Sequence, residues 1–234
     1  IIKKILKLIN RKYLSFIMDS QNLMVIDPAL EVPEIESFNG IVAKSPLKAT
    51  YHLPAIHSPD SMHIELKNTR GIILMGSAAS VNDQYEWMKD IEKVIFKAIE
   101  KQLPILGICF GHQFLAHLFG GKVDYLWDTT KKRGIRKVQT LENNLLIEPQ
   151  DDFLVYSHQE GVTISPKDFE VSATSEMVKI EGMVHKELPI WSFQPHIESS
   201  RTFATRIGVN SKDFEKTRPY SSVLLESFLK NLKY

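Results

Sequence analysis

The stretch LPILGICFGHQFLAHLFGG, residues 103–121, decides the fold of this 234-residue chain. Its first part, 103–108, is an apolar run typical of a buried parallel strand. Its second part, 110–121, is typical of a short helix and ends in two glycines, which commonly stop a helix. Because only Cys109 separates the two parts, the sequence predicts a strand that turns sharply into a helix.

The residues before this stretch repeat the same order of elements. GIILM, 71–75, predicts a second buried strand, and an apolar stripe within 80–101 predicts the helix that follows it. LMVID, 23–27, predicts the first strand, and 41–45 and 62–66 predict short strands. Alternating strands and helices imply right-handed βαβ units in a parallel sheet.

Beyond Gly121 the pattern changes to short β-like runs separated by turn residues, before a final helix around 219–232. We therefore expect an α/β fold with a mostly parallel central sheet and a strand-rich C-terminal half. The chain shows no internal repeat and no linker. Residues 18–234 are accordingly predicted to form a single domain.

Residues 1–17, IIKKILKLINRKYLSFI, interleave basic residues with Ile and Leu at helical spacing. We interpret them as a basic amphipathic extension ahead of the domain, with a membrane-surface helix as the alternative. The stretch lacks the pattern of a signal peptide, and no apolar run in the chain approaches the roughly 18–20 residues that span a bilayer. The net charge of +1 gives no global attraction to nucleic acid. We expect neither a nucleic-acid nor a membrane partner.

Cys109 is the only cysteine in the chain, which excludes an internal disulfide and fits a reducing, cytoplasmic location. No two histidines have the i,i+4 spacing of a helical metal site, so we expect no metal and no cofactor. A helix start facing Cys109 favours the reactive thiolate. Gly107 and Gly111 leave room for a tight turn. The alternative is that Cys109 is a small buried residue at a helix start.

A thiolate that attacks an amide needs an acid–base group and a partner that orients it. In WSFQPHIE, 191–198, His196 and Glu198 are two residues apart, so an extended segment would point both to one face. The alternative is a surface histidine beside a solvated carboxylate. The backbone amide of Phe110, with one from the loop 76–78, could stabilise an oxyanion. The chain contains neither GxxxxGK[ST] nor GxGxxG, which argues against a phosphate cradle.

Four blocks in order resemble a class I glutamine amidotransferase domain over roughly residues 21–200. They are the glycine-containing turn after GIILM, LGICFGHQ (106–113), SHQEGV (157–162) and QPHIE (194–198). The resemblance implies a flavodoxin-like three-layer sandwich. It also implies cysteine-dependent hydrolysis of a γ-glutamyl amide through a glutamyl thioester, with release of ammonia.

Carried over residue by residue, Cys109, His196 and Glu198 match the family's catalytic triad. Ser77 and Phe110 take its oxyanion-hole positions through their backbone amides. The positions that resemble the family's substrate-binding residues are Gly76, Gln113, Ser157, His158 and Gln159. His112 belongs to the same motif, and we interpret it as a packing residue beneath the turn.

The chain departs from the family pattern at two places. MGSA (75–78) stands where the family has SGGP, with Ser77 in place of the second glycine. The usual HPE is His196-Ile197-Glu198, preceded by Pro195. Serine keeps the backbone donor in place only where its φ angle is an allowed one.

Further matches favour stand-alone members of the family, which include GMP-synthase-like proteins and γ-glutamyl peptidases. These matches are GSAASVND (76–83), GGKV (120–123) and GIR (134–136). The small-molecule substrate is then glutamine, with ammonia passed to a separate synthetase, or a γ-glutamyl peptide or conjugate. Two further alternatives are a weakly active regulatory or binding module, for which Ser77 and Ile197 argue, and a general cysteine peptidase.

Overall fold

The computed structural model describes residues 21–144 and 146–233, and the predicted extension at 1–17 lies outside them. Within the described residues, nine strands form one sheet in the order β2-β1-β3-β4-β11-β10-β9-β6-β7, and β5 pairs with β8 in a small second sheet. The strand bounds are Asn22–Ile26 (β1), Ala49–His52 (β2), Thr69–Leu74 (β3), Ile105–Ile108 (β4), Lys122–Tyr125 (β5), Lys132–Thr140 (β6), Asp151–His158 (β7), Glu160–Ile164 (β8), Phe169–Thr174 (β9), Gly182–His185 (β10) and Ile190–Phe193 (β11).

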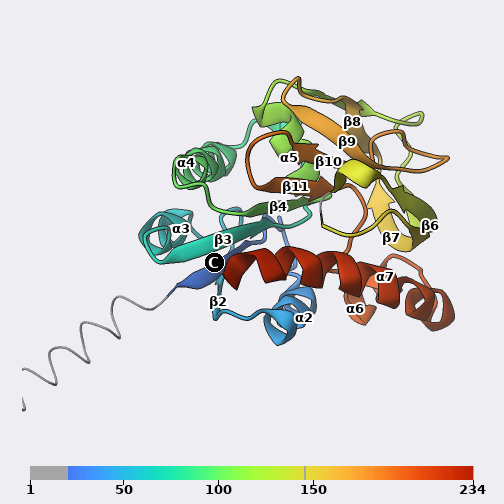
Figure 1. Cartoon of the computed structure of the whole chain (residues 1–234), viewed down its shortest axis with the longest axis horizontal. Helices are drawn as coiled ribbons and strands as arrows, with labels where there is room; N and C mark the ends of the chain where they lie inside the picture. Colours follow the sequence, from blue (N-terminus) through green and yellow to red (C-terminus); the bar gives the residue numbers. More distant parts are fainter. Residues whose placement is uncertain (1–20, 145, 234) are drawn as a thin grey trace, which may run out of the picture.

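Helices cover both faces of the sheet and make three layers (Figure 1). One apolar core lies under α3, α4 and α5, and a second lies under α2 and α7. The helix bounds are Ile35–Lys44 (α2), Asp60–Glu65 (α3), Glu86–Glu100 (α4), Phe110–Leu118 (α5), Arg201–Arg206 (α6) and Ser211–Lys230 (α7). The predicted three-layer α/β arrangement is therefore present.

The prediction of a mostly parallel central sheet is not confirmed, because the sheet is mixed. β2, β1, β3, β4 and β11 are parallel neighbours, whereas β10, β9, β6 and β7 join antiparallel beyond β11. The connections explain the change, since a parallel crossover needs about a dozen residues or more. Only residues 186–189 join β10 to β11, which restricts that pair to an antiparallel hairpin.

Three element predictions are wrong in type or extent. Residues 41–45 and 62–66 fall largely in α2 and α3 instead of strands. Short apolar runs cannot distinguish the two, and here the buried residues Ser37 and Ile41 stand four apart, at helical spacing. The final helix begins at Ser211, earlier than predicted, and Pro219 lies inside it.

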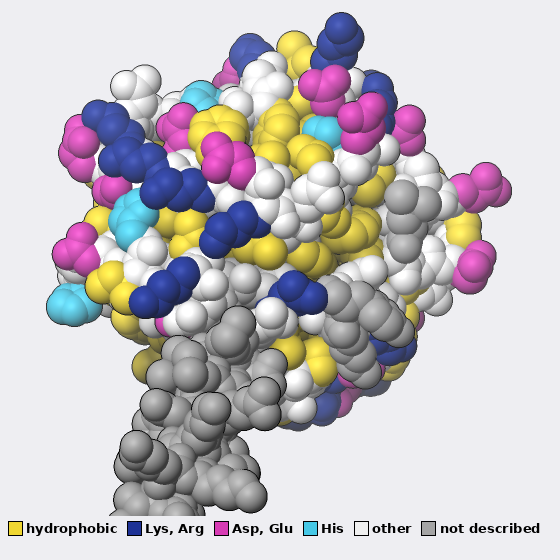
Figure 2. All heavy atoms as spheres, turned by 60° about the vertical axis from the view of Figure 1, so that its left-hand side comes forward, with side chains coloured by type: hydrophobic (Ala, Val, Ile, Leu, Met, Phe, Trp, Pro, Cys, Tyr) yellow, Lys and Arg dark blue, Asp and Glu magenta, His cyan; other side chains and the backbone are white. Residues whose placement is uncertain are grey.

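The outer face of the helical layer carries charges of both signs. Figure 2 shows Lys, Arg, Asp and Glu side chains interspersed with apolar ones on the face toward α3 and α4. Two of the ion pairs lie within α4, Lys89–Glu86 and Lys93–Asp90. Among residues 21–144 and 146–233, we find no helix with the length and apolar character needed to cross a membrane.

Two glycines let α5 lie directly against the strands. A Cβ on Gly111 would stand 2.1 Å from the carbonyl oxygen of Leu74 at the end of β3. A Cβ on Gly107 in β4 would stand 2.6 Å from the carbonyl oxygen of Gly111. The obstacle in both cases is backbone, which cannot rotate away as a side chain could. The position of α5 therefore depends on glycine at both sites.

We predict that Gly111→Ala lowers the free energy of unfolding by about 3 kcal/mol, because the helix must shift away from β3. Gly40→Ala is the matched control, since Gly40 lies in α2 with nothing within 4 Å of the added Cβ. That substitution should be neutral or stabilising by up to about 1 kcal/mol. Urea unfolding measures both variants, and equal stabilities would contradict the proposed close contact.

Candidate active site

Cys109 forms the turn between β4 and α5, as predicted. Its φ of 52° and ψ of −101° place a non-glycine residue in a sparsely populated backbone conformation. Such a conformation costs on the order of 1–3 kcal/mol and persists only where the surroundings hold it. The Cys109 amide donates to the Phe193 carbonyl at 2.9 Å, and α5 begins at the next residue. The thiol is buried, with 4% of the residue exposed.

His196 and Glu198 follow β11, the strand beside β4. Ile108 stands opposite Phe193 in that pair, so the chain leaving β11 stays next to Cys109. The His196 amide donates to the Val155 carbonyl at 2.8 Å, which fixes the segment against β7. Its ring Nδ1 lies 2.9 Å from Glu198 Oε1, and both side chains are buried. The predicted same-face arrangement of the two residues is present.

The pKa of His196 is raised to about 10. Burial is the largest influence and lowers it, but the negative charges of Glu198 and of Cys109 as a thiolate together outweigh burial. His196 therefore holds its proton at neutral pH. A protonated imidazole beside a thiolate is the resting state of a proton-shuttling pair.

Gly76 brings Cys109 and His196 together at the end of β3. A Cβ at Gly76 would lie 2.8 Å from His196 Cε1 and 3.5 Å from Cys109 Cβ. The three strand ends of β3, β4 and β11 thus deliver a glycine turn, a thiol and an imidazole to one edge of the sheet. In an open α/β sheet, this carboxyl edge is where the active crevice forms.

Ser77 fits its position without backbone strain, because its φ is not positive. Its hydroxyl donates to the Pro28 carbonyl at 2.6 Å and accepts from the Ala79 amide at 3.1 Å. Across the described parts of the chain, no hydrogen bond is donated by the amide of Ser77 or Phe110. Both amides are free to serve an oxyanion.

The predicted substrate-binding residues lie together in a small cavity of about 160 Å³ above the thiol. Its lining includes Cys109, Gln113, Ser157, His158 and Gln159. His158 is fixed by its own surroundings, with Nδ1 2.7 Å from the Glu160 carbonyl oxygen. Burial, aided by the charge of Arg136, lowers the pKa of His158 to about 2, so its ring stays neutral.

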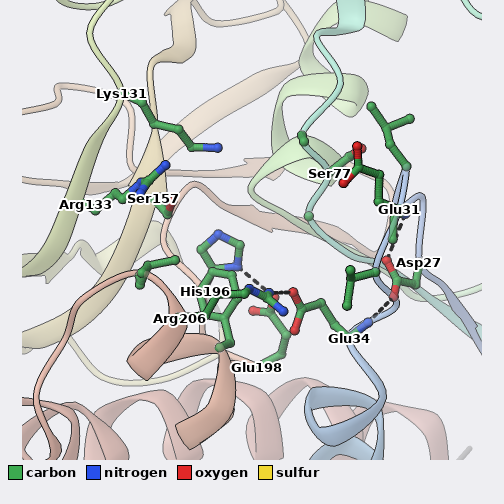
Figure 3. A pocket seen from close by; sticks show the side chains of 17 residues that line it. Asp27, Glu31, Glu34, Ser77, Lys131, Arg133, Ser157, His196, Glu198 and Arg206 are labelled. Carbon is green, nitrogen blue, oxygen red and sulfur yellow. Dashed lines mark hydrogen bonds and ion pairs between the residues drawn. The ribbon is translucent and has the colours of Figure 1, made fainter.

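A larger cavity of about 520 Å³ lies on the His196 side of the same edge (Figure 3). Gly76 and Glu198 line it, and it shares a wall with the small cavity at Ser77, Ala78, Lys131 and Ser157. Figure 3 shows Lys131 and Arg133 on one side and Glu31 and Asp27 on the other. This cavity has the size of a small-molecule site.

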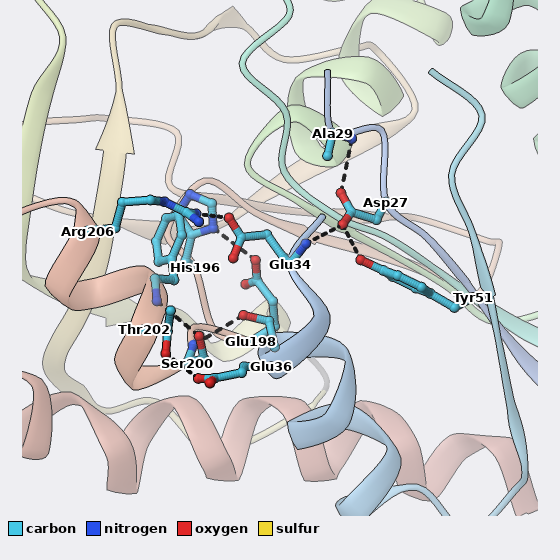
Figure 4. Close-up of polar contacts among 12 residues, drawn as sticks. Asp27, Ala29, Glu34, Glu36, Tyr51, His196, Glu198, Ser200, Thr202 and Arg206 are labelled. Atoms are coloured by element: carbon cyan, nitrogen blue, oxygen red, sulfur yellow. Dashed lines mark hydrogen bonds and ion pairs between the residues drawn. The ribbon is translucent and has the colours of Figure 1, made fainter. Parts of the chain in front are cut away.

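Sequence reasoning missed Asp27, which it treated only as the acidic end of a strand. Asp27 is fully buried and accepts hydrogen bonds from the amides of Ala29 (3.1 Å) and Glu34 (2.7 Å) and from the Tyr51 hydroxyl (Figure 4). Burial raises its pKa to about 6, against the opposing effect of the Tyr51 and Ala29 hydrogen bonds. Asp27 thereby holds the loop 28–34, which forms a wall of the larger cavity.

Two more contacts could not be read from the motifs. Arg206 of α6 pairs with Glu34, which ties the segment after Glu198 to the loop that Asp27 organises (Figure 4). Gln194 is the other case, with Nε2 3.7 Å from the Cys109 sulfur. Gln194 stands within the QPHIE block, but the block itself does not indicate which way its side chain points.

The arrangement at the strand ends has counterparts among known proteins. The family model "Glutamine amidotransferase class-I" matches residues 36–207. The chain belongs to the class I glutamine amidotransferase family. Its residues at the strand ends are therefore those of a family that contains amide-hydrolysing enzymes.

Relatives in this family include two archaeal proteins, each named as a subunit of glutamine-hydrolyzing GMP synthase. The Methanopyrus kandleri protein is 38% identical over 107 residues, 44% of this chain and 56% of that protein, so the match spans little more than half of the relative. The Pyrococcus abyssi protein is 35% identical over 141 residues, 59% of this chain and 71% of that protein.

Solved structures share the fold. A glutamine amidotransferase from Thermotoga maritima superimposes with a TM-score of 0.70 at 19% identity, covering 91% of this chain and 98% of that one. A glutamine amido transferase from Methylobacillus flagellatus gives 0.61 at 18% identity, covering 91% and 92%. At these identities the likeness supports the fold alone.

We predict that Ser77→Ala loosens the loop 76–79, because the Ala79 amide loses its acceptor and the tie to Pro28 is lost. Hydrogen–deuterium exchange of a peptide covering this loop should be faster than in the wild type. The cost to overall stability should stay near 1 kcal/mol, as for one hydrogen bond.

Ser45→Ala is the matched control, because the Ser45 hydroxyl accepts from the Leu47 amide in the same kind of turn away from the site. It should leave exchange in the loop 76–79 unchanged. Unaltered exchange in Ser77→Ala would show that the hydroxyl does not hold the loop.

Proposed function

We propose that this protein hydrolyses the γ-amide of glutamine to glutamate and ammonia, with Cys109 as the nucleophile. The observation that carries the proposal is the convergence of a buried thiol, a protonated imidazole and a carboxylate at one sheet edge. His196 lies against the same glycine as Cys109 and is paired with Glu198 at 2.9 Å. Membership of the glutamine amidotransferase family supports the same chemistry.

The proposed reaction begins when the Cys109 thiolate attacks the γ-carbonyl carbon. The carbonyl oxygen becomes an oxyanion, which the Ser77 and Phe110 amides stabilise. The C–N bond then breaks as His196 donates its proton to the leaving nitrogen, so ammonia departs and a glutamyl thioester remains. Water attacks the thioester, His196 takes up the water proton, and glutamate leaves with the thiolate restored.

Glu198 has two effects in this scheme. It holds the His196 ring with Nδ1 toward the carboxylate, so the other ring nitrogen is available to the reacting atoms. It also favours the charged imidazole, which is one cause of the raised pKa. The protein thereby keeps a proton ready for the leaving group at neutral pH.

We assign the glutamyl end of the substrate to the small cavity, where Gln113 and the backbone of residues 157–159 border the thiol. We further propose that the ammonia is passed to a separate synthetase. The relatives named as GMP synthase subunits support a partner of this kind.

We predict that Cys109→Ala lowers the rate of glutamate release from glutamine by about a thousandfold or more, since triad members act as a unit. Glutamate release by the purified protein measures this, with thermal unfolding to confirm that the fold is kept. A variant that retains its rate would contradict the nucleophile. If the wild type cleaves neither glutamine nor γ-glutamyl peptides, alone or with a synthetase, the binding-module alternative gains.

The larger cavity favours a second candidate function, the hydrolysis of γ-glutamyl peptides. His196 borders this cavity and donates the proton to the leaving nitrogen, so a large leaving group would extend into it. Ammonia needs no such space. A volume of about 520 Å³ accommodates an amino acid or dipeptide.

Two cations on the cavity wall would suit a leaving group with a carboxylate. Lys131 and Arg133 are two apart at the start of β6 and share a face, while Lys132 lies over the Trp127 ring at 4.7 Å. Among the described residues, no carboxylate lies within 4.0 Å of the charged groups of Lys131 or Arg133. Arg133 lines only the larger of the two cavities, so it would contact the leaving group and not the glutamyl end.

For this second candidate we predict that γ-glutamylglycine is cleaved faster than its C-terminal amide, and that Arg133→Met reduces the ratio of their kcat/KM values about three- to tenfold. Lys132→Met is the matched control on the opposite face of the strand and should keep the ratio. A ratio unchanged in Arg133→Met would refute the role of Arg133, while glutamine turnover reports separately on the principal proposal.

A further inference from the structure

Gln194 is the first residue after β11 and is fully buried. Its backbone amide donates to the Glu181 carbonyl at 2.7 Å, which fixes the start of the side chain. The side-chain Nε2 lies 3.7 Å from the Cys109 sulfur, within hydrogen-bond range for sulfur. Its Oε1 lies 3.1 Å from Gln113 Nε2. The side chain thus spans the distance between the nucleophile and Gln113.

The hydrogen-bond network sets which end of the Gln194 amide faces the sulfur. The Glu160 carbonyl can only accept, and it lies 2.8 Å from the Gln113 side chain, so Gln113 must direct its NH₂ group there. The second N–H of that group then donates to Gln194 Oε1. With its oxygen engaged in this way, Gln194 presents its own NH₂ group to Cys109.

We infer that Gln194 donates a hydrogen bond to the Cys109 sulfur and thereby stabilises the thiolate relative to the thiol. The donor is oriented in advance by the chain Glu160–Gln113–Gln194, and a hydrogen bond to an anion is stronger than one to a neutral thiol. Because the site is buried, water cannot easily replace the lost donor. The inference rests on the proposed function only in taking Cys109 as the reacting group.

The same network limits what Gln113 can offer a substrate. Both of its N–H bonds are used, one on Glu160 and one on Gln194, so its free Oε1 can only accept. Gln113 would therefore contact the α-ammonium group of a bound glutamyl compound and not its α-carboxylate.

The experiment measures the rate of iodoacetamide alkylation against pH in the full chain. Cys109 is the only cysteine, so the signal reports on one sulfur. Gln194→Met removes the donor at similar size, and Gln194→Glu keeps the shape but replaces the donor with an acceptor. Ser192→Ala is the control, because Ser192 is buried in β11 and contacts His112 at 2.9 Å. The titratable groups near the sulfur, His196, Glu198 and His158, stay in every variant.

In Gln194→Met the pH midpoint of alkylation should rise by about one unit, as expected for one hydrogen bond to a charged group. The rise should be larger in Gln194→Glu, and the midpoint should stay in place in Ser192→Ala. A midpoint unchanged in both Gln194 variants, with the fold kept by thermal unfolding, would overturn the inference. An equal rise in Ser192→Ala would also overturn it, because the effect would then be general loosening. Alkylation needs no substrate, so a failure of glutamine hydrolysis would be seen separately.

Discussion

The contact of α5 with the ends of β3 and β4 is the constraint on which the site depends. Gly111 lies so close to the Leu74 carbonyl that a methyl group would not fit, and this closeness fixes the start of the helix over the strands. Cys109 is held in its unusual backbone conformation between this helix start and the hydrogen bond to Phe193. The strain at the nucleophile is thus balanced by packing elsewhere, as is common at functional sites.

The second requirement is electrostatic. A buried imidazole would ordinarily lose its proton, because burial disfavours the charged form. Here Glu198 and the thiolate reverse that tendency, and the pKa of His196 rises instead. The loops around the pair are in turn held by polar contacts. Asp27 organises the residues after β1, and the Ser77 hydroxyl joins that loop to the turn after β3. The replacement of glycine by Ser77 therefore adds a connection, and no positive φ opposes it.

Much of the fold can be predicted from the sequence where a local signal exists. The buried strands at 71–75 and 103–108, the sharp turn at Cys109 and the helix after it all follow from apolar runs bounded by glycine. The order of strands and helices predicts the α/β class. The strand predictions for 41–45 and 62–66 are wrong, because runs of five residues carry no usable period. The antiparallel addition beyond β11 depends on loop lengths that only the paired strands make apparent.

The candidate site divides in the same way. Cys109, His196 and Glu198 stand in motifs whose residue types indicate the chemistry, and the structure brings them to one edge. Asp27, Gln194 and Arg133 have no such motif, because their importance comes from contacts between segments far apart in the chain. Gln194 and Cys109 are 85 residues apart, and no local pattern could place one amide against one sulfur.

The central claim, that Cys109 is a nucleophile served by His196 in a pocket shaped for a glutamyl group, can be tested by covalent labelling with a chloroketone analogue of glutamine. Peptide mass spectrometry locates the label. The account predicts about one label per chain at Cys109, protection by glutamine or a γ-glutamyl peptide, and much slower labelling in His196→Ala. Labelling at other residues, or labelling of Cys109 that neither ligand slows, would contradict it.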